Sequence, residues 1–556
     1  MLRVRFVGGG VCLAWLAVAQ VARAQERPSE ADMFGVTPPA PAPSAPALAD
    51  GPTPIGEPAS APASDTSAKV PPAAAAAGAP AAANPDPGES RDSQVLGANS
   101  RAMFSEEAAP EDPLKIGGQL YLRTQTSAAQ GQALEDWSFG APSLLDAYLD
   151  ARPNDRVRAF VLGRMVFDPT LPTSASADID TNRAMSATGS TSGSQSLSSL
   201  LQQPTRGPTV NLDQMWLRFD VLHRLFVTAG KQHVRWGTAR FWTPTDFLHL
   251  RPRNPLDVFD ARTGTTMIKL HLPVESRAWN FYGYVLTEAT GRTSNLGSVA
   301  AAARAELVFG PAELGLGALA KRGQKPKFAG DLSFGVGDFD FYGELALRSG
   351  NEVDRVRYDS AAEPPAFETP PSWQTPDAAA RAALARIADA YYPVYRSRGY
   401  KAQAVGGLNY AQKYNDNDTF TVGGEYFYNG LGYGDNAAYP GLVLPHSVGL
   451  NDSANFFYLG RHYAALFVSF PAPFSFDNHT FTLSTLGNLS DRSFISRFDY
   501  SLVALTHLRF EAFVSARYGS ESGEFRFGVR HLNLGGIDIN RAPALLDFGL
   551  ALRVAI

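Results

Sequence analysis

The last stretch of the chain alternates between apolar residues and polar or small residues with a period of two. One face of this stretch carries Phe548, Leu550, Leu552, Val554 and Ile556. The other face carries Asp547, Gly549, Ala551, Arg553 and Ala555. A strand that meets lipid on one face and a polar interior on the other has this pattern, and its sheet must close because lipid cannot satisfy an open edge. The alternation recurs from about residue 114 onward, so the sequence predicts an all-β chain that forms a transmembrane antiparallel β-barrel.

The predicted strands are joined by connections that are short at one end and long at the other. The strands that follow most directly from the alternation are 115–124, 143–152, 156–168, 211–221, 225–235, 497–505 and 508–518. The long connections are about 169–209, 350–400 and 429–454. Short periplasmic turns, long outer loops and an even strand number are typical of bacterial outer-membrane barrels. Counting in this way predicts about 18 strands, with about 16 as the alternative. Residues 524–530 then belong to the last outer loop, and 546–556 form the closing strand.

Composition excludes a helical membrane protein. After the N-terminal region, no apolar run reaches the roughly 18 residues that a membrane-spanning helix needs. The hydrophobic content of 44% and aromatic content of 11% are compatible with a barrel that has a polar lumen. The formal net charge of -5 gives no indication of a nucleic-acid partner.

The region before the first strand divides into two segments. Residues 1–24 have the features of a secretory signal peptide: basic Arg3 and Arg5, an apolar core, and Ala22-Arg23-Ala24 as the cleavage site. The single cysteine, Cys12, lies in this segment, so the mature chain is expected to have no thiol. Residues 25–112 are rich in proline and alanine and poor in aromatic residues, which predicts a disordered periplasmic tether. The barrel domain is then 113–556.

The most distinctive segment runs Gly230-Lys231-Gln232-His233-Val234-Arg235-Trp236-Gly237 and continues through Thr243-Pro244-Thr245-Asp246-Phe247. It resembles large outer-membrane porin-like barrels, a broad set that includes alginate-export-type and phosphate-selective-type porins. The resemblance implies that the connection 236–262 folds into the pore and narrows it. The candidate constriction residues are Arg235, Trp236, Arg240, Trp242, Asp246, Arg251, Arg253 and Asp257. Opposed charges would set a field there, and the rings of Trp236, Phe241 and Trp242 would offer flat surfaces to a solute. The alternative is that these residues anchor the loop to the barrel wall.

The faces that the alternation turns inward are rich in arginine. The candidate lumen-facing residues are Arg123, Arg158, Arg164, Arg218, Arg348, Arg461, Arg509, Arg517 and Arg553. An arginine-lined pore favours anions. Inward acids such as Glu511 leave an alternative, in which the arginines pair across neighbouring strands and serve the structure.

The sequence offers little for catalysis or metal binding. Its nine histidines include no His-x-x-x-His pair, and Gly-x-Ser-x-Gly does not occur. We therefore expect no catalytic residue, no metal site and no cofactor. A helix is predicted at 376–391 within the connection 350–400, because Thr375 is a good N-cap and Pro376 fits the first turn. It is either a lid at the pore mouth or an ordinary surface helix.

Taken together, these features predict a Gram-negative outer-membrane channel for the passive diffusion of small hydrophilic solutes, with anionic or sugar-like cargo as the finer expectation. Two alternatives stay open: a barrel for polysaccharide export or for a structural or binding role, and a hydrolase with its site at the barrel rim. The expected partners are outer-membrane lipid and lipopolysaccharide, the solutes, and the barrel-assembly machinery. The oligomeric state is left open.

Overall fold

The computed structural model describes residues 113–170, 208–249, 252–256, 262–287, 299–363, 386–387, 389–414, 418–442, 457–474, 476–534 and 537–555. Several predictions lie outside these residues. They are the signal peptide 1–24, the tether 25–112, the candidate residues Arg251 and Asp257, and most of the helix 376–391.

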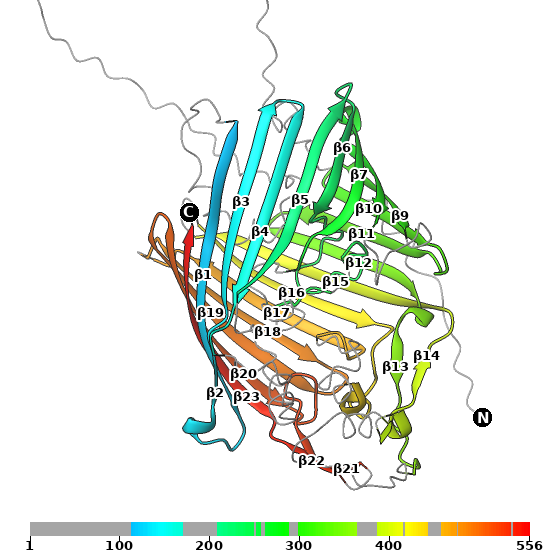
Figure 1. Cartoon of the computed structure of the whole chain (residues 1–556), viewed down its shortest axis with the longest axis vertical. Helices are drawn as coiled ribbons and strands as arrows, with labels where there is room; N and C mark the ends of the chain where they lie inside the picture. Colours follow the sequence, from blue (N-terminus) through cyan, green and yellow to red (C-terminus); the bar gives the residue numbers. More distant parts are fainter. Residues whose placement is uncertain are drawn as a thin grey trace, which may run out of the picture. The chain divides into compact units, whose positions relative to one another are not determined.

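Eighteen antiparallel strands close into a barrel (Figure 1). In chain order they are β1 (Leu114–Ala129), β3 (Ser143–Asn154), β4 (Val157–Phe167), β5 (Thr209–Val221), β6 (Leu225–Gln232), β7 (Thr265–Val274), β8 (Trp279–Leu286), β9 (Ala300–Phe309), β10 (Ala312–Lys321), β11 (Lys327–Val336), β12 (Phe339–Ser349), β15 (Tyr400–Lys413), β16 (Thr419–Asn429), β17 (His462–Pro471), β18 (His479–Asn488), β19 (Ser493–Leu505), β20 (Leu508–Gly519) and β23 (Ala544–Ala555). Each pairs with the next, and β23 pairs with β1 to close the ring. The prediction of 18 strands is confirmed, and the alternative of 16 is wrong.

The first strand, β1, closes the barrel because it pairs with β3 along one part of its length and with β23 along another. Its segment 114–122 pairs with β3, whereas its segment 119–129 pairs with β23, with Leu122 opposite Leu552. Beyond the end of β3, the short strand β2 (Ser138–Gly140) covers the edge of β1, with Gln125 opposite Gly140. β1 therefore continues to Ala129, past the predicted end at 124, because it has partners along its whole length.

The remaining described elements are short. β13 (Asp354–Val356) pairs with β14 (Val394–Arg396), and β21 (Val529–Leu534) pairs with β22 (Ile537–Arg541). The 3-10 helices are η1 (Leu134–Asp136), η2 (Glu275–Arg277) and η4 (Gly350–Glu352). Because β21 and β22 form a separate hairpin, residues 524–530 add no strand to the barrel, as predicted. Within the described part of the chain, no helix has both the length and the apolar character needed to cross a membrane.

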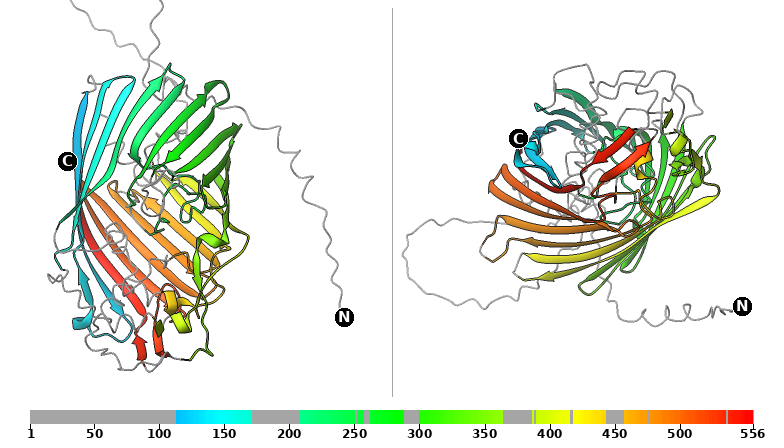
Figure 2. Two further views of the ribbon diagram at one scale, coloured as in Figure 1. Left: turned by 45° about the vertical axis from the view of Figure 1, so that its right-hand side comes forward. Right: turned by 90° about the horizontal axis from the view of Figure 1, so that it is seen from below.

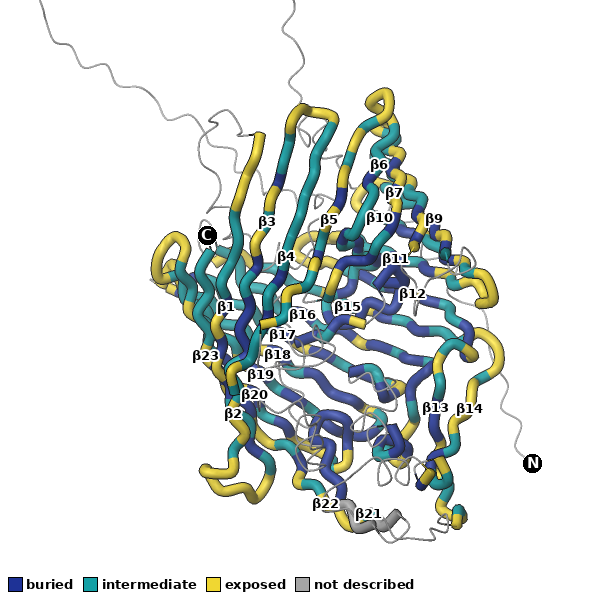
Figure 3. The backbone as a smooth tube through the Cα atoms, in the orientation of Figure 1, coloured by how far each residue is buried: buried dark blue, intermediate teal, exposed yellow. Residues whose placement is uncertain are grey.

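Side chains alternate across the barrel wall as the sequence pattern predicts. On β20, Phe510 and Val514 are 44% and 51% exposed on the outer face, whereas Ser515 and Arg517 are each 1% exposed on the inner face. Figure 3 shows buried and more exposed positions following one another along the other strands. Large apolar side chains on the outside of a closed sheet have lipid as their natural environment. The chain is a transmembrane antiparallel β-barrel.

At the end with the long connections, several loops share an apolar core that we call the outer cluster. It consists of Val356, Ile387, Tyr392, Ala438, Tyr439, Leu442, Leu459, Phe527 and Val529. These residues come from the connections after β12, β16 and β20. Residues 386, 387 and 389–391 are helical, and the Ile387 side chain is fully buried in the outer cluster. The described end of the predicted helix therefore packs against the other loops.

Candidate functional site: an inner loop fixed to the barrel wall

The connection from β6 to β7, residues 233–264, is called the inner loop, and its described residues lie inside the barrel (Figure 2). Strand β6 ends at Gln232 rather than at the predicted 235, because the chain leaves the wall there. Two apolar clusters join the described part of this loop to the wall. In the first, Val234, Trp236, Phe247 and Leu248 pack against β7 to β12 through Met267, Tyr284, Leu286, Ala300, Ala302, Leu319, Ala329 and Ala346. The inner loop thus covers this side of the wall.

The second cluster continues the contact around the barrel. Ala239, Phe241, Trp242 and Leu256 of the inner loop pack against the inner faces of β12 to β19. The wall residues are Tyr342, Val405, Phe427, Tyr463, Ala465, Phe467, Leu486 and Ile495. Trp242 is central: its ring centroid lies 5.6 Å from that of Phe427 and 5.4 Å from that of Tyr463. Its indole N–H donates to the Phe457 carbonyl oxygen at 3.0 Å.

Two buried glutamates of the wall bind the backbone of the inner loop. The Glu425 carboxylate on β16 accepts from the backbone N–H groups of Arg240 at 2.9 Å, Phe241 at 3.2 Å and Trp242 at 2.8 Å. Glu344 on β12 accepts from the Ala239 N–H at 2.7 Å. Both glutamates are 4% exposed. Charge-assisted hydrogen bonds of this kind are stronger than neutral ones, and here they also satisfy backbone donors that the loop buries.

A glycine makes the approach to Glu344 possible. Gly237 has φ of +99°, a conformation that other residues rarely adopt. A Cβ atom at this position would lie 2.3 Å from a Glu344 carboxylate oxygen. The same Cβ atom would lie 2.6 Å from the Thr245 hydroxyl, which donates to the Glu344 carboxylate at 2.6 Å. The Trp236-Gly237 pair in the sequence therefore reflects how tightly the loop meets the wall.

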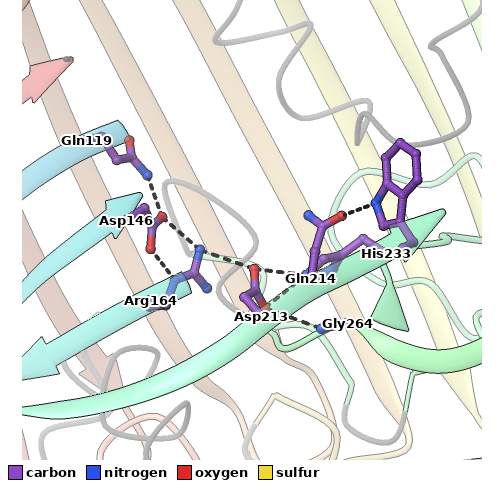
Figure 4. A network of polar contacts seen from close by, with 8 residues as sticks. Gln119, Asp146, Arg164, Asp213, Gln214, His233 and Gly264 are labelled. Carbon is purple, nitrogen blue, oxygen red and sulfur yellow. Dashed lines mark hydrogen bonds and ion pairs between the residues drawn. The ribbon is translucent and has the colours of Figure 1, made fainter. Parts of the chain in front are cut away.

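One aspartate holds both ends of the inner loop (Figure 4). Asp213 is the extra residue of a β-bulge, since Leu162 of β4 faces Gln214 of β5 and Gly163 faces Leu212. Its carboxylate lies 3.2 Å from His233 Nε2 at the start of the loop. The same carboxylate accepts from the Gly264 N–H at the end of the loop, at 3.3 Å. The bulge turns this carboxylate inward, where it is 1% exposed.

A row of alternating charges connects Asp213 to the first strands. Arg164 on β4 donates to Asp146 on β3 at 2.7 and 3.0 Å, and its guanidinium lies 3.6 Å from Asp213. Gln119 on β1 donates to Asp146 at 2.9 Å. Figure 4 shows these side chains in one row, and they come from β1, β3, β4 and β5. The ends of the inner loop are therefore fixed to β5, which lies outside the strands β7 to β19 that carry its two apolar clusters.

Replacing Arg164 by leucine is expected to destabilise the barrel by about 3–5 kcal/mol, because it leaves two buried carboxylates without their shared cation. Urea unfolding of the refolded protein in detergent measures the loss. Arg396→Leu is the control, since Arg396 pairs with Asp354 at the surface, where both side chains are exposed. This control should change stability little. Equal effects of the two substitutions would contradict the role of the buried row.

The aromatic residues predicted to face a solute do not do so. Trp236, Phe241 and Trp242 are 1%, 3% and 0% exposed, because their rings fill the space between the inner loop and the apolar wall. That part of the prediction is wrong: an amphipathic loop inside a barrel turns its large rings toward the wall. Arg304 of the wall lies over the Trp236 ring, with its guanidinium carbon 5.7 Å from the centroid.

The charged candidates of the inner loop bind mainly within the loop. The Asp246 carboxylate pairs with His249 at 2.9 Å and with Arg262 at 3.0 Å. Burial alone would raise the pKa of Asp246, but these two neighbours hold it well below its ordinary value. Arg235 donates to the Ala239 carbonyl oxygen. Arg253 donates to the Arg240 carbonyl oxygen at 3.1 Å.

The candidate lumen arginines lie in several different settings. Ion pairs join Arg158 to Asp150 at 2.9 Å, Arg517 to Asp547 at 2.8 Å and Arg553 to Glu511 at 3.0 Å. Four others lie over aromatic rings or beside another arginine: Arg123 over Phe513, Arg218 over Trp216, Arg348 over Phe247, and Arg509 opposite Arg553.

Arg461 differs from the prediction. It precedes β17 and is exposed, and its backbone N–H donates to the Ser490 hydroxyl at 3.0 Å. The alternation in the sequence assigned Arg461 to the same face as the inward residues of β17. It could not show that β17 begins only at the next residue, His462. Among the described residues, no group of three or more histidine, cysteine or acidic side chains is placed to hold a metal ion.

No family model and no curated protein matches the chain. It is similar to OccK8 (OprE) of Pseudomonas aeruginosa, at 8% identity and a TM-score of 0.43, over 80% of this chain and 98% of that one. It is also similar to OccK11 (OpdR) of the same organism, at 10% identity and a TM-score of 0.41, over 80% of this chain and 96% of that one. A triple mutant of Rhodopseudomonas blastica porin is similar at 10% identity and a TM-score of 0.35, over 80% of this chain and all of that one.

Proposed function

We propose that the protein is an outer-membrane channel through which small hydrophilic solutes diffuse passively. One observation carries this proposal: the inner loop packs on apolar side chains of the inner faces from β7 to β19 and covers that side, while the inner faces of β20, β23, β1 and β3 to β5 carry ionic and amide side chains. Water and polar solutes are compatible with that second part of the wall. The solute path is therefore an off-centre route along the polar strands, narrowed from one side by the inner loop.

The finer features of the proposal follow from charge and chain direction. Anionic or sugar-like cargo is favoured by the arginines of the polar wall, including Arg123, Arg509 and Arg553. A periplasmic location for the segment before β1 is part of the proposal, and it is supported by the pairing of Leu114 with Ala151 beside the short connection between β3 and β4. Lipopolysaccharide and the barrel-assembly machinery are the partners that such a location entails. The candidate constriction residues would act indirectly in this channel: they stabilise the inner loop, and the inner loop narrows the solute path.

Planar-bilayer recording tests this function. The purified full chain, folded in detergent, should give discrete conductance steps in potassium chloride, and reversal potentials in a salt gradient should favour the anion. A folded barrel that gives no steps would overturn the channel and support the alternative of a structural or export barrel. Steps with a cation preference would overturn the anionic cargo alone.

A further inference from the structure

A buried acidic side chain lies where the outer cluster meets the barrel. Glu524, in the connection after β20, is 0% exposed. Its carboxylate accepts from the Tyr463 hydroxyl at 2.5 Å, from the Asn488 side-chain amide at 2.8 Å and from the Leu459 N–H at 3.2 Å. These partners belong to β17, to β18 and to the loop before β17. A single carboxylate therefore joins three separate parts of the chain.

A second carboxylate lies beside the first. Asp491, in the short connection between β18 and β19, accepts from the Glu524 N–H at 2.9 Å and from the same Asn488 amide at 2.8 Å. The Ser493 hydroxyl donates to it at 2.6 Å. The Tyr439 hydroxyl of the outer cluster completes the site, at 3.2 Å from the Asn488 amide nitrogen. Two carboxylates and two phenols thus share one buried space.

No cation balances this site among the described residues. Arg492, the residue after Asp491, is exposed. Arg526 donates to the Gly519 carbonyl oxygen at 3.0 Å, and Arg517 pairs with Asp547 at 2.8 Å. Arg530 pairs with Glu521 at 2.7 Å. Two adjacent buried carboxylates cannot both carry charge without a large cost in free energy. Burial and the neighbouring Asp491 accordingly raise the pKa of Glu524 to about 8.

The segment around Glu524 also links the two apolar cores. Phe525 is 2% exposed and packs in the cluster of the inner loop, where its ring centroid lies 5.5 Å from that of Phe457. Phe527 is 4% exposed and packs in the outer cluster. Two residues apart on one short segment, these rings tie the outer loops to the inner loop. Seen from that end of the barrel, the hairpin β21–β22 that follows lies in front of the space that the strands enclose (Figure 2).

We propose that Glu524 is a proton-binding site that controls the outer cluster: with the proton bound, the outer loops stay packed on the barrel mouth, and loss of the proton releases them. An ionised Glu524 would stand beside Asp491 without a cation, so charge repulsion and the cost of burying a charge would both favour the released state, in which water reaches the carboxylate. The consequence for solute passage rests on the proposed channel. The release itself does not.

The sign of the pH dependence follows from linkage. In the released, hydrated state the carboxyl has its ordinary pKa of 4.5, whereas in the packed state the value is about 8. The packed state therefore holds the extra proton between these two values. Release is suppressed at low pH, increases by up to about tenfold per pH unit across this interval, and levels off above it.

Thiol labelling of the full chain in detergent tests the proposal directly. The only natural cysteine is Cys12, so in a Cys12→Ser background an introduced cysteine is the single thiol of the full chain. Ala438 is 5% exposed in the outer cluster, and its neighbour Ala437 is exposed. The ratio of maleimide labelling rates for Ala438→Cys and Ala437→Cys cancels the intrinsic effect of pH on thiol reactivity. We expect this ratio to increase by roughly tenfold or more from pH 6 to pH 8.

Two variants complete the experiment. Glu524→Gln has nearly the same shape and cannot ionise, so the labelling ratio should become independent of pH. Asp491→Asn removes the neighbouring negative charge, so the plateau should be reached at a lower pH. A flat ratio in the otherwise natural protein, or an unchanged slope in Glu524→Gln, would overturn the proposal. Bilayer recording is run in parallel. A labelling ratio that depends on pH, in a protein that does not conduct, would reject the channel and keep the proton site. Conductance together with a labelling ratio that does not change with pH would reject the proton site and keep the channel.

Discussion

Replacing Glu425 by alanine is expected to raise the single-channel conductance, because it releases the inner loop from the wall. The carboxylate is the acceptor for the N–H groups of Arg240, Phe241 and Trp242. Each buried donor that loses its acceptor costs about 1–3 kcal/mol. The loop then gains conformations that reach water, and the route that it narrows becomes wider. Bilayer recording measures the conductance, and the largest sugar that still enters the channel measures the width.

Two further substitutions separate this effect from general damage. Glu521→Ala removes an acidic side chain that pairs with Arg530 in the outer loops, where both are exposed, and it should leave the conductance unchanged. Glu425→Gln keeps an oxygen acceptor without the charge, so an intermediate conductance is expected. If Glu425→Ala folds into a heat-modifiable barrel and conducts like the unsubstituted protein, the glutamate does not position the loop.

Replacing Trp242 by alanine is expected to lower the free energy of unfolding by about 3–5 kcal/mol, the usual loss for a large buried aromatic residue. The indole is fully buried, and it packs on Phe427 and Tyr463 while donating to the Phe457 carbonyl oxygen. The substitution also leaves a cavity between the inner loop and the wall. Urea titration followed by tryptophan fluorescence gives the change in stability.

The matched control is Trp137→Ala. Trp137 is a half-buried residue beside β2 whose ring meets Phe548 edge to face at 6.4 Å. Because that ring keeps part of its surface in contact with solvent or lipid, its removal should cost much less than that of Trp242. A loss for Trp242→Ala no larger than that for Trp137→Ala would show that the inner loop contributes little to the stability of the barrel.

The barrel itself could be predicted because each wall strand presents its two faces to two different environments. On β20, the predicted outward Phe510 and Val514 and the predicted inward Arg517 all lie as expected. The same reasoning left residues 524–530 outside the barrel, although their pattern resembles a strand, since an even count required it. For these residues, the requirement for an even number of strands predicted the structure better than their own strand-like pattern did.

The inner loop could be located but not oriented from the sequence. A loop within a barrel has one side toward the wall and one toward water, and no periodicity marks which is which. Trp236 and Trp242 were therefore assigned to the solute path, although they are buried. A useful signal was present in the wall. Glu344 faces Asp331 and Val405 on its neighbouring strands, and Glu425 faces Gly407 and Ala465. An inward carboxylate with no basic neighbour must find its donors elsewhere.

The single aspartate that receives both ends of the inner loop has a consequence for how this barrel can change over evolutionary time. With His233 and Gly264 held at one carboxylate, the distance between the strands at the base of the loop is independent of what lies between them. Doubling the length of a flexible loop costs only about 0.6 kcal/mol in closure entropy. Insertions and deletions at positions of this segment that do not contact the wall are therefore cheap, and they would alter what passes without disturbing strand order. Because Asp213 fixes the ends of the inner loop, the inner loop can change in sequence and length while the strands of the barrel wall stay the same.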